Sequence, residues 1–403
     1  MKIIMRLLKF LLLAALPLVL LTACDEEGGL EAADDDAAGE AAEEDADWPS
    51  QEEVVADIDE VVERMDAGEL EYDQGADSDE VIEALQEVIP QPEDFPTRAI
   101  EWVIGFVEGG GSDNFARFAG YDAERIFGQD MIYNNMPGAS GEVALGHVLT
   151  QQADGYTLSG PIANQVINDA LGVQPYSFVD DFDQVIRLQG PTEIYWVVED
   201  SEWETFEDML DHAVENPGDV TVTGSGIGGD DELRLLALEQ ELDTDFIYVP
   251  FDGVGDRTSG LLSGDIDVMH ETAGTVFDLY EDGQIRPLAY GGDIVFEDID
   301  PDIPSVAELG YDVPANRWRG IAVTAGVDPQ VLDYLHNVFY AATQLPYYTD
   351  YEADFFQDVA GGYLNSEEFA QDAMEERETI TQLAEELDYD TEAMEEELEE
   401  DEE

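Results

Sequence analysis

Two glycine-rich turns constrain the fold of this chain more than any other feature. The first spans Gly109 to Asp113 and the second spans Gly224 to Gly229, and each follows an apolar strand-like run and opens a helical pattern. Glycine lets a backbone approach a ligand closely, and the N-terminus of a helix offers unpaired N–H groups to an anion. One such turn in each half of the chain predicts a binding cleft between two lobes.

Strand-like apolar runs alternate with helical patterns from about Arg98 onward. This alternation is typical of an α/β fold with mainly parallel sheets that are covered by helices on both faces. The predicted strands are 102–107, 157–161, 194–198, 220–223, 246–249, 266–269 and 321–324.

Helix signals lie between most of these strands, including patterns over 113–127 and 232–242. Asp328 and Pro329 form a good N-cap and first-turn pair for a helix that runs to about Ala342. Ser366 is predicted to cap a late helix whose first turn carries acidic residues.

The chain begins like an export signal, with basic residues ahead of a short apolar run, Phe10 to Leu20. That run is shorter than the roughly 20 apolar residues that a membrane-spanning helix needs. Cys24, the only cysteine, stands where a lipoprotein signal is processed, so we expect residues 1–24 to be a lipoprotein signal peptide and Cys24 to be lipidated. An ordinary signal peptide with an accidental cysteine is the alternative. We expect the protein to be exported and held at the outer face of the cytoplasmic membrane, in an extracytoplasmic or periplasmic location.

The charge balance is extreme, with 98 acidic residues against 14 basic ones and a net charge of -84 at pH 7. A field of one sign destabilises a compact state unless salt screens it, and at about 1 M ionic strength the Debye length is only ~3 Å. Acidic residues occur throughout the chain, so we expect a halophilic protein that works in concentrated salt. Nucleic acid is excluded as a partner because phosphates would be repelled.

The acidic stretch before residue 97 has little to bury, and we interpret 25–96 as a tether that carries two short amphipathic helices, near Val54 to Met65 and Val81 to Ile89. These helices pack either on the body or on a partner, and the sequence does not decide which. The run 388–403 is interpreted as an acidic tail.

Signals for an enzyme are thin. Gly224, Gly226 and Gly229 match the G-x-G-x-x-G dinucleotide pattern, which leaves a nicotinamide-dependent oxidoreductase open as an alternative. The four histidines are scattered and form no known catalytic or zinc-binding spacing. We therefore expect no catalytic residue, no cofactor and no metal site.

A set of short motifs together resembles one known family, the extracytoplasmic solute-binding proteins of tripartite tricarboxylate transporters. The resemblance covers about residues 98–387. It is carried, in order, by IGFVEGGGSDNFARFAG at 104–120, NNMPGASGEVA at 134–144, ADGYTL at 153–158, GSGIGG at 224–229, YVPFDG at 248–253, SGDIDVM at 263–269, IPSVAELGY at 303–311 and WRG at 318–320.

The resemblance implies a two-lobed, periplasmic-binding-protein-like (type II) fold with a hinge between two α/β domains. Lobe 1 would comprise 97–197 and 318–387, and lobe 2 would comprise 198–317. Such a protein closes on a small carboxylate like a Venus flytrap and delivers it to the integral-membrane subunits of the transporter. A ligand-sensing surface lipoprotein is a further alternative.

The resemblance also implies which residues bind the carboxylate, mainly through backbone N–H groups. These are Gly110, Gly111, Ser112 and Asp113 in the first turn, Ala139 in the PGASG segment, and Ser225, Gly226 and Gly228 in the second turn. Arg319 would add a bidentate contact. The acids at 230–232 depart from the family pattern and would repel a carboxylate, so an amino-acid-like or cation-bridged ligand stays open.

Overall fold

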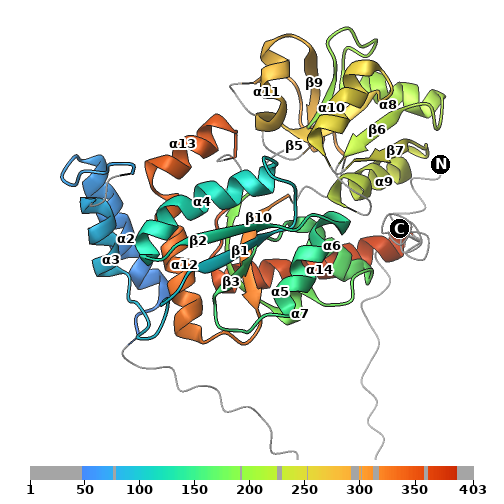
Figure 1. Cartoon of the computed structure of the whole chain (residues 1–403). Helices are drawn as coiled ribbons and strands as arrows, with labels where there is room; N and C mark the ends of the chain where they lie inside the picture. Colours follow the sequence, from blue (N-terminus) through green and yellow to red (C-terminus); the bar gives the residue numbers. More distant parts are fainter. Residues whose placement is uncertain are drawn as a thin grey trace, which may run out of the picture. The chain divides into compact units, whose positions relative to one another are not determined.

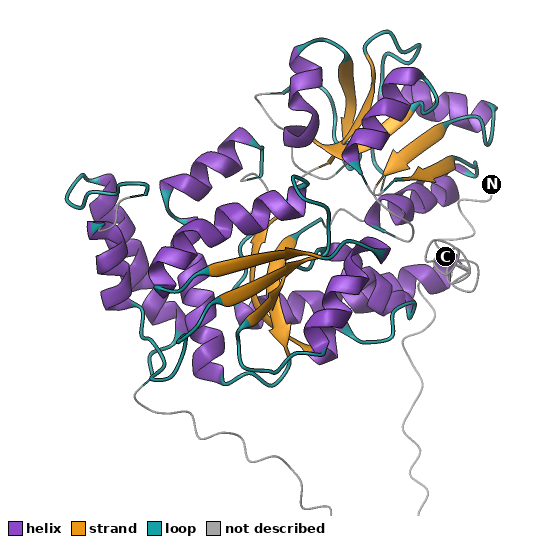
Figure 2. Cartoon of the chain, viewed as in Figure 1, coloured by secondary structure: helices purple, strands orange, loops and turns teal. Residues whose placement is uncertain are grey.

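The computed structural model describes residues 48–75, 79–190, 193–224, 229–251, 253–291, 299–300, 302–311, 317–357 and 362–387. The predicted signal peptide with Cys24, the first part of the tether and the acidic tail lie outside these residues. The described residues form two five-stranded sheets, each with its own helices (Figures 1 and 2). We call the part around the first sheet lobe 1 and the part around the second sheet lobe 2.

The first sheet has the strand order β2-β1-β3-β10-β4. Strand β1 pairs in parallel with β2 and β3, whereas β10 runs antiparallel between β3 and β4. Trp102 of β1 packs in its core against Phe115 and Phe339. The strands are β1 Ile100–Ile104, β2 Met131–Asn135, β3 Thr157–Ser159, β4 Phe182–Gln189 and β10 Arg319–Thr324.

The second sheet has the strand order β7-β6-β8-β5-β9. Strand β6 pairs in parallel with β7 and β8, and β5 runs antiparallel between β8 and β9. The strands are β5 Glu193–Val198, β6 Thr221–Gly224, β7 Ile247–Pro250, β8 Val268–Thr272 and β9 Ile285–Tyr290.

The pairing corrects two expectations. Both sheets are mixed rather than mainly parallel, because β5 and β10, the first strands after the chain passes from one sheet to the other, run against their neighbours. The predicted lobe boundary after residue 197 is also too late, since β5 belongs entirely to the second sheet. An apolar run such as Ile194 to Val197 fits the interior of either sheet, and only its pairing with β8 and β9 decides.

Helices fill the connections between strands. Asp328 caps α12 as predicted, because its carboxylate accepts the N–H of Gln330. The prediction for Ser366 is wrong, since the side chain of Asn365 accepts the N–H of Glu368 while the Ser366 hydroxyl donates to the carbonyl of Val185. In lobe 1 the helices are α2 Gln51–Asp66, α3 Glu80–Val88, α4 Gly111–Phe127, α5 Glu142–Leu149, α6 Ala163–Leu171, α7 Phe178–Asp181, α12 Pro329–Thr343, α13 Pro346–Asp354 and α14 Ser366–Leu387. In lobe 2 they are α8 Phe206–Glu215, α9 Asp230–Leu242, α10 Val254–Ser263 and α11 Ala273–Glu281.

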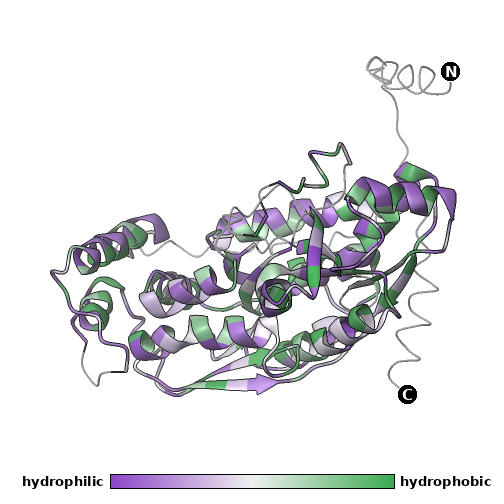
Figure 3. Ribbon diagram, turned by 90° about the horizontal axis from the view of Figure 1, so that it is seen from above, coloured by the Kyte–Doolittle hydropathy of each residue, from purple (hydrophilic) through white to green (hydrophobic). Residues whose placement is uncertain are grey.

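The two N-terminal helices pack on the body of the protein, which the sequence had left open. Val54 and Ile58 of α2 and Leu85 of α3 are buried in the same hydrophobic core as the first sheet. The hydroxyl of Tyr340 on α12 donates to Asp59, which adds a polar contact to this packing. Hydrophobic and hydrophilic residues alternate along single helices in Figure 3, as expected where one face packs inward.

Within the described residues, no helix combines the length and the apolar character needed to cross a membrane. An apolar cluster from α6, α9 and α14, which includes Ile167, Leu233 and Ile380, connects the two lobes.

Candidate ligand-binding site

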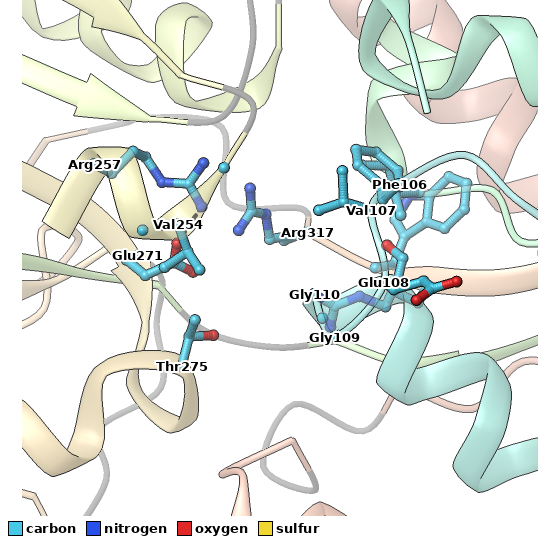
Figure 4. A pocket seen from close by; sticks show the side chains of 17 residues that line it. Phe106, Val107, Glu108, Gly109, Gly110, Val254, Arg257, Glu271, Thr275 and Arg317 are labelled. Atoms are coloured by element: carbon cyan, nitrogen blue, oxygen red, sulfur yellow. Dashed lines mark hydrogen bonds and ion pairs between the residues drawn. The ribbon is translucent and has the colours of Figure 1, made fainter. Parts of the chain in front are cut away.

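A cavity of about 230 Å³ has walls from both lobes. In Figure 4, Arg257, Glu271 and Thr275 of lobe 2 lie on one side, and Phe106 and Gly110 of lobe 1 lie on the other. Arg317, two residues before the first residue of β10, lies between them. The complete lining is Phe106, Val107, Glu108, Gly109, Gly110, Gly111, Ser112, Ile162, Gly253, Val254, Gly255, Arg257, Glu271, Thr275, Arg317, Trp318 and Arg319.

The first glycine turn lies where the sequence predicts it, between β1 and α4. Gly109 has a φ of +78°, which favours glycine, and Gly110 is the N-cap of α4 without a side-chain capping bond. Gly110, Gly111 and Ser112 all line the cavity. The first N–H groups of a helix have no intrahelical acceptor and carry the positive end of the helix dipole, so this wall suits an anion.

Arg319 reaches the same wall from strand β10. A Cβ placed on Gly111 would lie 2.6 Å from Nη2 of Arg319, so glycine is what allows the guanidinium to lie against the turn. The Nη1 group donates to Oε1 of Gln189 at 3.2 Å and to Oε1 of Gln357 at 2.9 Å. The Nε group is buried and has no hydrogen-bond partner among the residues that the structure describes.

Arg319 is a buried cation without a carboxylate partner among the described residues. Every other described arginine forms an ion pair except Arg286, which donates to backbone carbonyls instead. Arg319 is only 9% exposed, and burial lowers its pKa. Burying an isolated charge costs free energy, so the position of Arg319 favours the binding of an anion in the cavity.

Two predicted residues of lobe 1 do not line the cavity. The Asp113 carboxylate accepts hydrogen bonds from Nε of Arg117 at 2.9 Å, from Nδ2 of Asn135 at 3.0 Å and from the N–H of Gly109 at 2.8 Å. Burial opposes the charged form, but these hydrogen bonds prevail and lower the pKa of Asp113. Its contacts therefore fix the shape of the first turn. Ala139 lies in a short 3-10 turn, Ala139–Gly141, and is not among the lining residues. The predicted residues of the second turn, Ser225, Gly226 and Gly228, lie outside the described residues.

The lobe 2 wall carries an ion pair that sequence reasoning missed. Arg257 of α10 donates to the carbonyl of Phe251 at 2.8 Å and to the Glu271 carboxylate in a close contact. The other oxygen of Glu271 accepts the N–H of Thr272 at 2.9 Å. Burial disfavours the charged carboxylate, but the neighbouring Arg257 and Arg317 guanidiniums outweigh it and lower the pKa of Glu271.

Arg317 is held by acids behind this wall. Its guanidinium contacts Glu193 closely and lies 3.5 Å from Asp230 and 3.6 Å from Asp231. Nδ1 of His270 lies 2.5 Å from Asp231 and 3.0 Å from Glu193. Glu193, Asp231 and His270 have the donor types of a metal site, but the Arg317 guanidinium already supplies positive charge there.

The missed residues had one signal in the sequence. Lysine and arginine together number only 14 in 403 residues, and Arg234, Arg257, Arg317 and Arg319 all lie at the cavity or directly behind its wall. In so acidic a chain, an arginine at a buried position indicates that it balances negative charge there. Arg257 and Arg317 could have been singled out on that ground, whereas their partners could not.

The fold and the cavity define a two-lobed solute-binding protein. Residues 115–387 match the family described as the tripartite tricarboxylate transporter family receptor, TctC, and the chain belongs to this family. The helices α2 and α3 lie outside the matched residues.

Two curated relatives illustrate the similarity. The UPF0065 protein in the gbd 5' region of Cupriavidus necator is 29% identical over 288 residues, which cover 71% of this chain and 86% of the relative. Protein BugT of Bordetella pertussis is 25% identical over 260 residues, covering 62% of this chain and 78% of BugT.

Solved structures share the fold. MatC from Rhodopseudomonas palustris with bound malate has a TM-score of 0.64 at 21% identity, covering 72% of this chain and 99% of MatC. An R. palustris protein with adipate has a TM-score of 0.66 at 21% identity, covering 73% of this chain and 98% of the relative. The family consists of solute-binding receptors, and this overturns the alternative of a nicotinamide-dependent oxidoreductase at the second glycine turn.

Proposed function

We propose that this protein is an extracytoplasmic receptor that captures a small carboxylate between its lobes and delivers it to the integral-membrane subunits of a tripartite tricarboxylate-type transporter. Cys24 would anchor it to the membrane by a lipid, and concentrated salt would screen the repulsion among its acidic residues. No bond is made or broken in this function, and no cofactor takes part.

The observation that carries the proposal is the position of Arg319 beside the N-terminus of α4. A ligand carboxylate at this wall would accept hydrogen bonds from the N–H groups of Gly111 and Ser112 and would neutralise the buried guanidinium. The buried guanidinium of Arg319, which has no carboxylate partner among the described residues, then gains a counterion. Ser225, Gly226 and Gly228 remain the proposed backbone contacts of the second turn.

We expect the lobes to close on the ligand because residues of both lobes line the cavity. A ligand held at α4 is therefore also in reach of Thr275 and Arg257. A ligand shifts the protein toward a closed state only if it binds that state better than the open one, and contacts to both walls provide this difference.

Isothermal titration calorimetry in molar salt tests the proposal, with a panel of small carboxylates as probes. We expect saturable binding to the wild-type protein, a loss of at least about 100-fold in Arg319→Gln, and partial recovery in Arg319→Lys, which keeps the charge. Arg64→Gln removes one exposed guanidinium far from the cavity and serves as the matched control. Unchanged affinity in folded Arg319→Gln would contradict the proposed site.

A further inference from the structure

The charges of the two cavity walls differ, and this difference bears on the ligand. Lobe 1 presents one cation, Arg319, that has no carboxylate partner among the described residues, together with the N-terminus of α4. One carboxylate on the ligand satisfies this wall. A second carboxylate would have to find its counter-charge in lobe 2.

Among the described residues at the lobe 2 wall and directly behind it, every guanidinium has a carboxylate partner. Arg257 is paired with Glu271, Arg317 with Glu193, and Arg234 lies 3.4 Å from Asp230. Asp231 adds a fourth carboxyl group. Burial raises the pKa of Glu193 well above its usual range, but the other three carboxylates still match the three guanidiniums in number. Helix α9 also begins with its own acids, Asp230 and Asp231, which already occupy the positive end of its dipole.

Helices α10 and α11 also begin at this wall, at Val254 and Ala273. Each helix N-terminus offers only about half a positive charge. Glu271 presents a full negative charge in the same wall and is 4% exposed, so solvent and salt screen it poorly. A second ligand carboxylate would meet Glu271 or would have to displace it from Arg257. The first outcome brings two like charges together, and the second leaves a buried carboxylate without its partner, so both are unfavourable.

The remaining lining suits an uncharged ligand body. Phe106, Ile162, Val254 and Trp318 contribute apolar surface between the two charged walls. Burying a methylene group against such surface is expected to tighten binding roughly fourfold.

We infer that the ligand is a monocarboxylate with an uncharged body, and that Glu271 is the residue that discriminates against a second carboxylate. The inference rests on the proposed carboxylate site at α4 and Arg319. Excluding a competitor by an unfavourable contact is a common way to obtain specificity. This chain would then differ from the two R. palustris relatives solved with malate and with adipate, which are both dicarboxylates.

Matched acids test the inference without any mutation. We would titrate the full chain in molar salt at pH 7.5 with butanoate against succinate, hexanoate against adipate, and benzoate against terephthalate. Each pair shares a carbon skeleton or ring and differs by one carboxylate. We expect the better-bound pair to favour the monocarboxylate by at least about tenfold. A dicarboxylate that binds equally well or better overturns the inference and leaves the proposed function standing, whereas binding by no member of any pair counts against the proposed function itself.

Glu271→Gln tests the assigned residue by a gain of binding. The variant keeps the shape of the side chain and removes the negative charge, so the preference for the monocarboxylate should fall by about tenfold, mainly because the dicarboxylate binds more tightly. Glu281→Gln is the control, because Glu281 is an exposed acid of lobe 2, at the end of α11, that does not line the cavity. A folded Glu271→Gln protein with an unchanged preference refutes the role of Glu271. If this variant does not fold, the comparison of matched acids in the wild-type protein still decides the ligand class.

Discussion

The guanidinium of Arg319 lies directly against Gly111, so closely that a Cβ on Gly111 would be 2.6 Å from Nη2. Gly111 is therefore required for packing rather than for a special backbone conformation. We predict that Gly111→Ala displaces Arg319 and weakens carboxylate binding by about 10- to 100-fold, as measured by calorimetry. Gly146→Ala is the control, because its Cβ would meet no atom within 4 Å and alanine is the better helix former. Wild-type affinity in Gly111→Ala would show that carboxylate binding does not depend on the present position of Arg319.

Arg125 attaches the N-terminal helices to lobe 1. Its guanidinium lies 3.0 Å from Asp79, the N-cap of α3, and 2.6 Å from Asp122 of α4, and both carboxylates are buried. We predict that Arg125→Ala lowers the free energy of unfolding by about 3 kcal/mol, because two buried carboxylates lose their partner. Chemical denaturation in molar salt measures this change.

Arg64→Ala is the matched control for Arg125→Ala. The pair of Arg64 with Glu69 spans 4.0 Å at the surface, and removing it should cost less than about 1 kcal/mol. Equal effects of the two substitutions would contradict the attachment role of Arg125.

Sequence reasoning reached the two-lobed α/β class, the family and the first glycine turn because each rests on local patterns. It missed Glu271 and Arg257, whose pairing depends on the approach of β8 and α10, and no local pattern reports that approach. The boundary after residue 197 failed for the same reason, since hydrogen bonding to β8 and β9 places β5. Asp113 was predicted as a ligand contact from its position in the turn, yet its carboxylate is directed to Arg117 and Asn135.

Glu376 of α14 should make stability depend on pH. Its carboxyl accepts the indole N–H of Trp318 at 2.8 Å, and burial raises its pKa from 4.5 to about 8. Between these values the native protein holds a proton that the unfolded chain has released. The stabilising contribution is therefore complete below about pH 4.5 and is lost as the pH rises through about 8.

We predict that Glu376→Gln removes this decline of the unfolding free energy between pH 5 and 8, because glutamine keeps an acceptor for Trp318 and does not titrate. Denaturant titrations of both proteins across this range provide the measurement. Glu378→Gln, an exposed position on the same helix, is the control and should leave the decline unchanged. An equal dependence of stability on pH in the wild-type protein and in Glu376→Gln would contradict the assignment to Glu376.

His336 should act with the opposite sign. It is buried in α12, where Nδ1 lies 2.9 Å from the Asn337 side-chain oxygen, and burial lowers its pKa from 6.5 to about 4. The unfolded chain takes up a proton below pH 6.5 that the native protein refuses, so this contribution is present above pH 6.5 and is lost as the pH falls to about 4. NMR of the imidazole should show no protonation of His336 in the folded protein at pH 5.5. A midpoint near 6.5 would contradict the burial of a neutral ring.

Removing salt should unfold the protein, because the net charge of -84 acts against a compact state. The Debye length grows from about 3 Å at 1 M to about 10 Å at 0.1 M ionic strength, so acids on neighbouring helices begin to repel one another. We expect the far-UV circular dichroism of the helices to be lost on dialysis to low salt and to return when sodium chloride is restored. A fold that persists at low salt would contradict self-repulsion as the cause.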